Sequence, residues 1–563
     1  MKKLIECVPN FSEGRDMNVI NQITAEIEKI EGVKLIDVDP GQATNRTVVT
    51  MVGTPDEVLE AAFQAIKKAQ ELIDMRKHSG AHPRFGATDV CPLVPVANIS
   101  MEETAEFAHK LAKRIGEELE IPIYCYENAA RSENRRNLAV CRAGEYEALG
   151  DRVITEEWKP DFGPAAWTEK QMKSGATAVS ARNFLVAVNF NLNTTSTRRA
   201  SAIAFDVREK GRQKREGGVL SGKLIKDENG KVVWEAGLLK HTKAIGWFID
   251  EYGVAQVSMN MTNIEETPLH IAFDTVSERS RIRGIRVSGA ELVGVIPLKA
   301  MLDAGRHYLR LQERSTGISD SELIKIAVKS MGLDDLYPFE PNKKIIEYIL
   351  EDESSHPLIN MNLTEFVEET ASESPAPGGG SIAAYMGAMG SALGTMVANL
   401  SSHKRGWDER WEEFSDWAEK GKHYHDQLLK MVDEDTNAFN LIMEAFGLPK
   451  KTDEDKAARK QAIQDATKYA IDVPFKTMEL CHESMEVMKA MAEFGNPNSV
   501  TDAGVGALAA MAGVRGAFLN VKINTADLED KDFVNDVISR GTDIVNRAAV
   551  LEQEILAVVE SKI

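Results

Sequence analysis

The sequence predicts a multidomain protein in which two α+β units, each a β-sheet with helices on one face, precede an all-α domain. Three observations lead to this prediction. Strand-like and helix-like segments alternate over roughly the first 130 residues in the order β-α-β-β-α-β, which is typical of such a layered sheet. A second series of strands begins at residue 184. From Asn362 onward, apolar residues recur with helical spacing and no alternating strand pattern is convincing.

The individual elements follow from the spacing of apolar residues and from turn residues. In the first unit we expect strands at 4–8, 33–38, 46–52, 88–96 and 121–126, and helices at 15–30, 55–73 and 101–119. In the second unit we expect strands at 184–192, 244–248 and 255–259, and helices at 196–213 and 268–281. Asn229-Gly230 lies between two apolar runs and predicts a β-hairpin over 218–236.

Composition shifts indicate the domain boundaries. We place one α+β subdomain at 1–181, a second at 182–350, a polar linker at 351–357 and the helical domain at 358–563. The last domain has about 200 residues, a normal size for an independent unit.

Charge and cysteine content narrow the class of protein. The formal net charge of −20 argues against nonspecific nucleic-acid binding. Five cysteines without a CxxC motif indicate neither a disulfide framework nor structural zinc, so we expect a cytoplasmic protein. The uncharged stretch 382–399 is rich in Ala, Gly, Ser and Met, and we interpret it as a buried helix rather than a membrane span.

A loop around His82 is the first candidate for chemistry. The order Gly80-Ala81-His82-Pro83-Arg84 presents an imidazole beside a guanidinium on a loop stiffened by proline, which suits a general base close to an anionic substrate. A surface histidine with no role is the alternative. His78 and His82 have the spacing of a zinc-binding helix, but Gly80 and Pro83 disfavour a helix there, so no metal is expected.

A second polar loop lies between two predicted strands. It combines the carboxylate of Asp39 with the polar side chains of Asn45 and Arg46, which makes it a candidate binding site. Turn formation by Asp, Pro and Gly explains the same loop equally well. The run 10–14 is compatible with a helix N-cap alone.

In the helical half, a glycine-rich helix start is the third candidate. Gly378, Gly379, Gly380 and Ser381 let a ligand approach the backbone closely at a helix N-terminus, which favours anions. The run lacks the Lys-Ser/Thr ending of a nucleotide P-loop, which disfavours a kinase or ATPase. Gly387, Gly390 and Gly394 are interpreted as sites of tight helix packing.

Asp435 is the fourth candidate. It shares a helical stripe with Leu428, Val432, Phe439 and Ile442, whereas Asp433 and Glu434 are predicted to point elsewhere. A carboxylate within an apolar stripe is costly unless it is paired or functional. We therefore expect Asp435 to take part in catalysis.

Taken together, these motifs resemble a known bifunctional family. The run 6–14, the loop 39–46 and His82-Pro83-Arg84 resemble glutamate formiminotransferase, and the Pro377–Ser381 helix start with Val432, Asp435, Ala438 and Phe439 resembles formiminotetrahydrofolate cyclodeaminase. The resemblance covers nearly the whole chain in the order of the bifunctional enzyme. This chain departs from the pattern in a longer 163–175 stretch and in an inserted hairpin at 218–236.

The resemblance implies two reactions and a set of residues. The formimino group of formiminoglutamate, a product of histidine breakdown, passes to tetrahydrofolate, and the product then cyclises to methenyltetrahydrofolate and ammonia. His82 would be the transferase base and Asp435 the cyclodeaminase acid, with Asp39, Asn45, Arg46 and Arg84 on the substrate. Folate, expected to be polyglutamylated, would contact Gly163, Pro164, Gly175 and the 378–381 loop. We expect a homo-oligomer with dimer contacts in the helical domain, and no nucleic-acid or membrane partner.

Two alternatives remain for the helical half. It also resembles methenyltetrahydrofolate cyclohydrolases, which release no ammonia. It can also be a folate-binding or oligomerisation module without activity.

Overall fold

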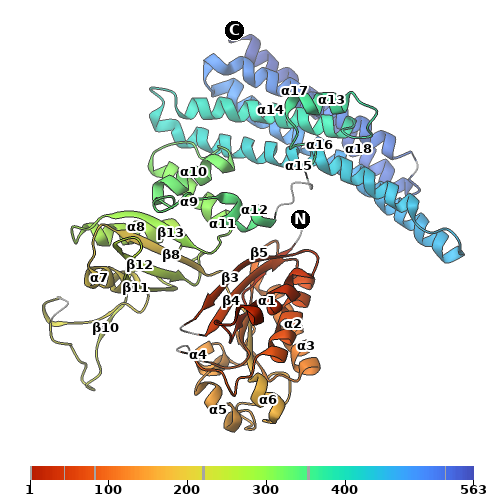
Figure 1. Ribbon diagram of the computed structural model, residues 1–563. Coiled ribbons are helices and arrows are strands. Elements are labelled where there is room, and N and C mark those ends of the chain that lie inside the picture. The colour runs from red at the N-terminus through yellow and green to blue at the C-terminus, as the bar shows by residue number, and fades with distance from the viewer. Residues whose placement is uncertain (1–2, 43–44, 81–83, 219–221, 351–355, 527) are drawn as a thin grey trace. The chain divides into compact units, whose positions relative to one another are not determined.

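The computed structural model describes residues 3–42, 45–80, 84–218, 222–350, 356–526 and 528–563 (Figure 1). The chain forms two compact units. One contains Met1–Ala300 and Met331–Leu350, and the other contains Met301–Ser330 and Glu351–Ile563. The first unit holds both large β-sheets and the second is helical throughout.

The first sheet has seven strands. They are β1 (Leu4–Cys7), β2 (Asn10–Phe11), β3 (Val33–Gly41), β4 (Arg46–Gly53), β5 (Thr88–Ala97), β6 (Ile123–Glu127) and β7 (Thr177–Ala181). Strand β7 was not expected. It lies between β5 and β6 and runs parallel to both, whereas the other pairings in the sheet are antiparallel.

Helices cover both faces of part of this sheet, so the prediction of helices on one face only is wrong. On one face, α1 (Met17–Glu28), α2 (Pro55–Leu72) and α3 (Met101–Arg114) share one apolar cluster with Ile123 and Cys125 of β6. Along the same strand, Tyr124 and Tyr126 point the other way and pack with Cys141 and Leu149. Those two residues belong to α4 (Leu138–Cys141) and α5 (Glu145–Arg152). The bulky tyrosines need a second apolar cover, and these short helices provide it.

The second sheet is fully antiparallel. Its order is β11 (Thr242–Ile249), β12 (Val254–Met261), β8 (Val186–Leu192) and β13 (Val287–Val293). Helices α7 (Thr197–Val207) and α8 (Leu269–Arg281) pack against it. The predicted helix 196–213 ends at Val207, six residues early, because the chain turns at Gly211 with φ +65° and Arg212–Gln213 form strand β9.

The chain between β9 and β10 (Trp234–Glu235), which we call the arm, extends from this sheet (Figure 1). The predicted turn at Asn229-Gly230 is confirmed, since Asp227 N–H donates to Lys231 O at 2.8 Å and Val233 N–H donates to Ile225 O at 3.0 Å. The base of the arm extends beyond the predicted 218–236 range on its N-terminal side, because β10 pairs with β9.

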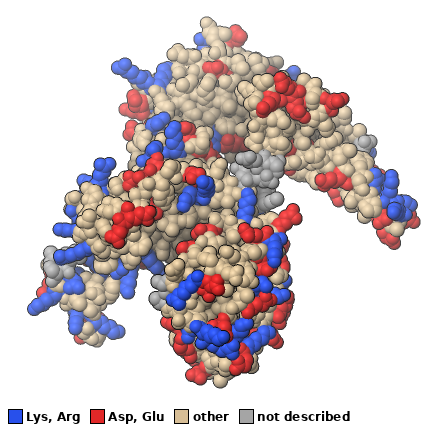
Figure 2. All heavy atoms as spheres, in the orientation of Figure 1, with Lys and Arg blue, Asp and Glu red and all other residues tan. Residues whose placement is uncertain are grey.

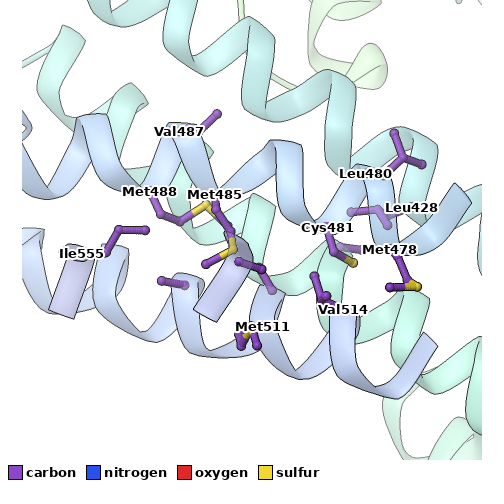
Figure 3. Packing of buried hydrophobic residues seen from close by; sticks show 14 of the residues in the cluster. Leu428, Met478, Leu480, Cys481, Met485, Val487, Met488, Met511, Val514 and Ile555 are labelled. Atoms are coloured by element: carbon purple, nitrogen blue, oxygen red, sulfur yellow. The ribbon is translucent and has the colours of Figure 1, made fainter. Parts of the chain in front are cut away.

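The helical unit is built around long helices. They are α13 (Leu363–Thr370), α14 (Gly379–Ser402), α15 (Trp411–Gly447), α16 (Asp453–Phe494), α17 (Val500–Asn524) and α18 (Lys531–Glu560). Figure 3 shows the core between them, in which Leu428 of α15, Met478 and Cys481 of α16, and Val514 of α17 lie together. The core is rich in methionine and alanine, which permits close helix packing.

The glycines of α14 pack against other helices of the same chain. A Cβ at Gly387 would lie 2.3 Å from Cys481 Sγ, and a Cβ at Gly390 would lie 2.6 Å from Gly506 O. Both distances are below van der Waals contact. The predicted tight-packing role of these glycines is therefore confirmed within one chain.

The helical unit also recruits a segment that we had assigned to the second α+β subdomain. Helices α9 (Leu298–Leu311) and α10 (Asp320–Met331) lie largely in this unit, whereas α11 (Pro341–Lys344) and α12 (Ile346–Leu350) lie in the first. Thr316 N–H donates to Ser415 Oγ at 3.0 Å, and Asn399 Nδ2 donates to Gly317 O at 2.8 Å. These buried bonds explain why the compact units differ from the expected 182–350 subdomain.

Two helical segments are long and apolar enough to cross a membrane by length and composition. They are Gly379–Ser402 and Pro497–Asn524. The apolar stretch of 18 residues in these two segments is 61% and 50% buried inside the structure, respectively. In α14, Ser381, Ser391 and Ser401 are fully buried and their hydroxyls donate to carbonyl oxygens of α14 or α15. This packing fits the interpretation of 382–399 as a core helix.

Candidate functional sites

In the first unit, Asn45 joins three loops. Its Oδ1 accepts from Gly14 N–H at 3.0 Å, its Nδ2 donates to Ser79 O at 3.0 Å, and its carbonyl lies 2.8 Å from His78 Nε2. Its φ is +50°, a conformation that asparagine tolerates better than most residues. Asn45 thus fixes the start of the loop that carries His82.

His82 itself lies outside the described residues, as do Ala81 and Pro83. The residues on both sides of the gap are held firmly. His78 contacts the Asn45 carbonyl, and Arg84 Nη1 donates to the carbonyls of Met75 and His78. The described anchors therefore bring the ends of the loop to the same place as Asn45.

Arg46 belongs to a buried cluster of charges. Its Nε and Nη2 donate to Asn10 Oδ1 at 2.9 and 2.6 Å, and its Nη1 lies 2.8 Å from Asp89 Oδ2. Arg142 donates to the same Asp89 oxygen. Burial lowers the pKa of Arg46, which the Asp89 carboxylate counteracts. The cluster places two guanidinium groups together, and such a pair can attract a carboxylate-bearing substrate.

Arg84 has a different set of contacts from the one expected. Nε and Nη2 donate to Glu147 Oε1 at 3.0 and 2.6 Å, and the guanidinium lies 4.7 Å from the centre of the Tyr146 ring. Its donors are thus already engaged by the protein. Asp39 is exposed near the end of β3. It lies away from the contacts described above for Asn45 and Arg46.

A pocket of about 440 Å³ brings Arg84 next to the predicted folate stretch. Trp167 and Met172 of that stretch line it together with Arg76, Arg84 and Tyr146. Helix α6 (Glu169–Ser174) ends at Gly175, where φ is +66° and a Cβ would lie 2.5 Å from Phe85 O. Gly175 therefore lies against Phe85 and Gly86, which lie between the His82 loop and strand β5.

Gly163 and Pro164 lie at the other end of the stretch. Gly163 has φ +84°, and a Cβ there would lie 2.3 Å from Ile121 O. This close approach gives Gly163 a role in packing. The structure brings Gly175 to the His82 loop but places Gly163 against a different segment.

In the helical unit, Asp435 faces the N-terminus of α14. Ser381 N–H donates to Asp435 Oδ2 at 3.0 Å, and Ser381 Oγ donates to Val432 O at 2.8 Å. A Cβ at Gly380 would lie 1.9 Å from Asp435 Oδ1, so only glycine leaves room for the carboxylate. The predicted candidates Gly380, Ser381 and Asp435 are therefore in direct contact.

Two opposing effects act on this carboxylate. Burial raises the pKa of Asp435, while the hydrogen bonds from Ser381 lower it, and burial prevails. The positive end of the α14 dipole also favours the ionised form. An acid with a raised pKa can hold a proton closer to neutral pH and give it to a leaving group.

The predicted stripe on α15 is only partly correct. Leu428 and Val432 are fully buried, but Phe439 is 43% exposed. Asp433, which was expected to point away, is buried and accepts hydrogen bonds from the backbone N–H groups of Leu358 and Ile359 at 2.9 and 3.3 Å. The cause is the segment before α13, which packs on that side of α15 and needs an acceptor for its free N–H groups.

Three family models match the chain: the N-terminal subdomain of the formiminotransferase domain at 4–182, the formiminotransferase domain at 187–351, and formiminotransferase-cyclodeaminase at 362–541. The formimidoyltransferase-cyclodeaminase of Gallus gallus is 40% identical over 563 residues, covering 100% of both chains. The chain belongs to the formimidoyltransferase-cyclodeaminase family.

Single-function relatives match each half of this family member. The glutamate formimidoyltransferase of Streptococcus pyogenes is 40% identical over 313 residues, which is 56% of this chain and 95% of the relative. The methenyltetrahydrofolate cyclohydrolase of Methylorubrum extorquens is 40% identical over 204 residues, which is 36% of this chain and 98% of the relative. Each half thus corresponds to a protein that exists by itself.

Several residues of the two sites in this family member were not found from the sequence. Asn10 was noted only within the 6–14 run, as part of a cap or of the family resemblance, and Asp89, Arg142 and Asn520 were not singled out. A Cβ at Gly379 would lie 3.3 Å from Asn520 Nδ2, so Asn520 borders the glycine-rich loop. Of these residues, Asp89 could have been found from the sequence, because it is a charged residue inside a largely apolar strand.

Proposed function

We propose that the protein transfers the formimino group of N-formimino-L-glutamate to tetrahydrofolate, giving 5-formiminotetrahydrofolate and L-glutamate. It then cyclises this product to 5,10-methenyltetrahydrofolate with release of ammonia. The observation that carries the proposal is the full-length match to relatives named formimidoyltransferase-cyclodeaminase. The reactions belong to histidine degradation and one-carbon metabolism, and we assign them to the cytoplasm.

In the transfer step, a folate nitrogen attacks the amidine carbon of the substrate. The imidazole of His82 takes the proton of that nitrogen and returns it to the glutamate amine as the carbon–nitrogen bond breaks. Arg46, held by Asn10 and Asp89, and Arg142 attract the substrate carboxylates. Folate occupies the pocket bordered by Trp167 and Arg84.

In the second step, the other folate nitrogen attacks the same carbon and gives up its own proton to the formimino nitrogen, and ammonia leaves. Asp435 transfers a proton to the departing nitrogen, which burial favours because the carboxyl group keeps its proton to a higher pH than usual. The loop from Gly378 to Ser381 lets folate reach the carboxylate, since the glycines add no side chain there.

The alternative for the helical half is hydrolysis of methenyltetrahydrofolate, as the name of the Methylorubrum relative indicates. The two activities differ in whether ammonia appears. The test mixes formiminoglutamate, tetrahydrofolate and the full-length protein, and follows methenyltetrahydrofolate absorbance together with ammonia.

Equal amounts of both products support the proposal. Transfer without ammonia would leave only the transferase half active as proposed. Hydrolysis of added methenyltetrahydrofolate, without ammonia from formiminotetrahydrofolate, would favour the cyclohydrolase. Running the assay with monoglutamyl and polyglutamyl tetrahydrofolate tests the polyglutamate preference that the resemblance implies.

We further propose that the protein is a homo-oligomer with contacts in the helical unit. Two neighbouring helices, α14 and α17, expose large apolar side chains: Met389, Met396, Leu400, Val505, Leu508, Leu519 and Ile523. Exposed apolar surface of this extent favours association with a second copy. Sedimentation analysis of the full-length chain should show a dimer or larger assembly, and a stable, active monomer would contradict this.

A further inference from the structure

The arm beside the second sheet forms a pocket that neither proposed reaction uses. It has a volume of about 660 Å³, within the range of ligand sites. We call it the arm pocket, and its lining residues are Phe205, Arg208, Arg212, Lys214, Arg215 and Trp234, with Ile225 and Glu235 among the others. None of the site residues described above lines it.

The arm pocket carries an excess of positive charge. Arg212 is neutralised, because its Nη1 lies 3.1 Å from Asp206 and its Nε 3.4 Å from Glu235. Within the described ranges of the chain, no carboxylate forms an ion pair with Arg208, Lys214 or Arg215. Figure 2 shows the Lys and Arg side chains that gather on the arm.

The arginines are held in place by backbone oxygens. Arg208 Nε donates to Gly211 O at 3.0 Å, and Arg215 Nη1 donates to Gly222 O at 2.8 Å. Each keeps further N–H donors for a ligand, since a guanidinium has five. Positioned cations that lack a carboxylate partner are suited to a multiply charged anion.

Two aromatic side chains complete the arm pocket. Trp234 is 41% exposed, and Phe205 lies beside Arg208, whose guanidinium is 4.2 Å from the ring centre. Lys210 Nζ lies 4.7 Å from the Trp234 ring centre. An exposed tryptophan next to cations can stack on a planar ring whose anionic groups contact those cations.

We propose that the arm pocket binds a nucleotide-like ligand, with its phosphate groups on Arg208, Lys214 and Arg215 and its ring against Trp234. The site is separate from the two proposed reactions. It is built on the arm, in which we expected residues 218–236 to be an insertion relative to the family pattern.

Calorimetric titration of the full-length protein tests this with two probes, ATP and inorganic triphosphate. We expect ATP to bind and triphosphate to bind at least tenfold more weakly, because it lacks a ring. Lys214→Glu should weaken ATP at least tenfold. The matched control is Lys231→Glu, which makes the same charge change at the exposed turn outside the pocket, and it should leave the affinity within twofold.

Trp234→Ala separates the ring from the phosphates. It should weaken ATP at least fivefold and leave triphosphate binding unchanged. No heat with ATP at millimolar concentration, or an equal loss in Lys214→Glu and Lys231→Glu, would overturn the proposal.

A kinetic measurement with folate distinguishes the arm pocket from the transferase site. Lys214→Glu should leave the KM for polyglutamyl tetrahydrofolate unchanged. A rise in that KM without ATP binding would assign the pocket to the folate substrate instead. Because ATP binding is measured without turnover, failure of the proposed transferase activity would not affect this result.

Discussion

The two halves of the molecule hold their candidate functional groups in different ways. In the first unit, Asn45 and Arg46 reach across loops and are fixed by hydrogen bonds to Gly14, Ser79 and Asn10. In the helical unit, Asp435 is fixed by two regular helices, since α15 presents it to the first turn of α14. The loop site is held by many polar bonds, whereas the helix-end site needs open space at Gly380 for the Asp435 carboxylate.

This difference predicts different sensitivities to substitution. The loop site should lose activity when single side chains change and otherwise keep its fold. The helix-end site should be sensitive also to added volume, because Gly380 leaves no room for a Cβ beside Asp435.

Asp435→Asn should stop ammonia release while formimino transfer continues. Asparagine keeps the size and the hydrogen bond from Ser381 but cannot supply a proton. A general acid is commonly worth about a hundred- to ten-thousand-fold in rate. Product analysis should show formiminotetrahydrofolate accumulating, and wild-type amounts of ammonia would exclude this role.

The pH profile of the wild type supplies a second readout for Asp435. Since burial raises its pKa, the proton is lost at a higher pH than for an ordinary aspartate. Ammonia release should therefore fall as pH rises through that pKa. A rate that climbs with pH over the acidic range would instead indicate a base.

His82→Ala should do the reverse, abolishing transfer and leaving cyclisation of supplied formiminotetrahydrofolate intact. Loss of a general base again costs about a hundred- to ten-thousand-fold. The fold should survive, because the described ends of the loop are held by Asn45 and Arg84. Near-normal transfer by the variant would show that another group is the base.

Gly380→Ala should impair cyclodeaminase activity by roughly ten- to a hundredfold, an intermediate loss for a displaced acid. The added Cβ would lie 1.9 Å from Asp435 Oδ1 and would push the carboxylate aside. Gly378→Ala is the comparison, since the nearest neighbour of its Cβ is Pro375 O at 3.8 Å, and its loss should be clearly smaller. Equal losses would mean that contact with Asp435 is not the cause.

The sequence predicted local structure better than contacts between distant segments. Ser381 and Asp435 were each singled out, but their hydrogen bond joins residues 54 positions apart and no spacing rule reveals it. Helical spacing placed Asp433 on the wrong side for the same reason, because the segment that buries it lies 75 residues earlier.

The same limit explains the errors in the fold. Strand β7 is separated from α6 by two residues and is only five residues long, so its alternation is weak. The expected boundary at 350 coincides with a break between the two compact units, but the placement of 301–330 in the helical unit is decided by tertiary contacts such as Gly317 against Ala418. Long regular helices, by contrast, were predicted well because their apolar period is sustained.

A fragment of residues 357–563 should fold but should be less stable than one of residues 298–563. The shorter fragment lacks the bonds of Thr316 to Ser415 and of Gly317 to Asn399, and the Asp320–Lys422 ion pair. At roughly 0.5–1.5 kcal/mol for each buried bond, the difference should reach about 2–4 kcal/mol. Urea unfolding followed by circular dichroism measures it, and equal midpoints would show that α9 and α10 contribute nothing.

Glu6 offers the final comparison with Asp435, since both are carboxyl groups whose pKa burial raises. Burial raises the pKa of Glu6 to about 7, with Arg182 opposing the shift. Asp435 accepts a hydrogen bond from Ser381, whereas Glu6 accepts none within the part of the chain that the structure describes. We therefore expect Glu6 to cost stability when it is ionised.

The direction in which stability changes with pH follows from proton binding. Between the ordinary pKa of 4.5 and about 7, the folded state holds more protons than the unfolded state, so the stability of the first unit falls as pH rises. Glu6→Gln should remove this loss. The variant should match the wild type at pH 4 and exceed it at pH 8 by up to about 3 kcal/mol. Urea unfolding at both pH values is the measurement. A variant that is less stable at pH 8 would show that the ionised Glu6 is compensated by Arg182, and the contrast with Asp435 would then disappear.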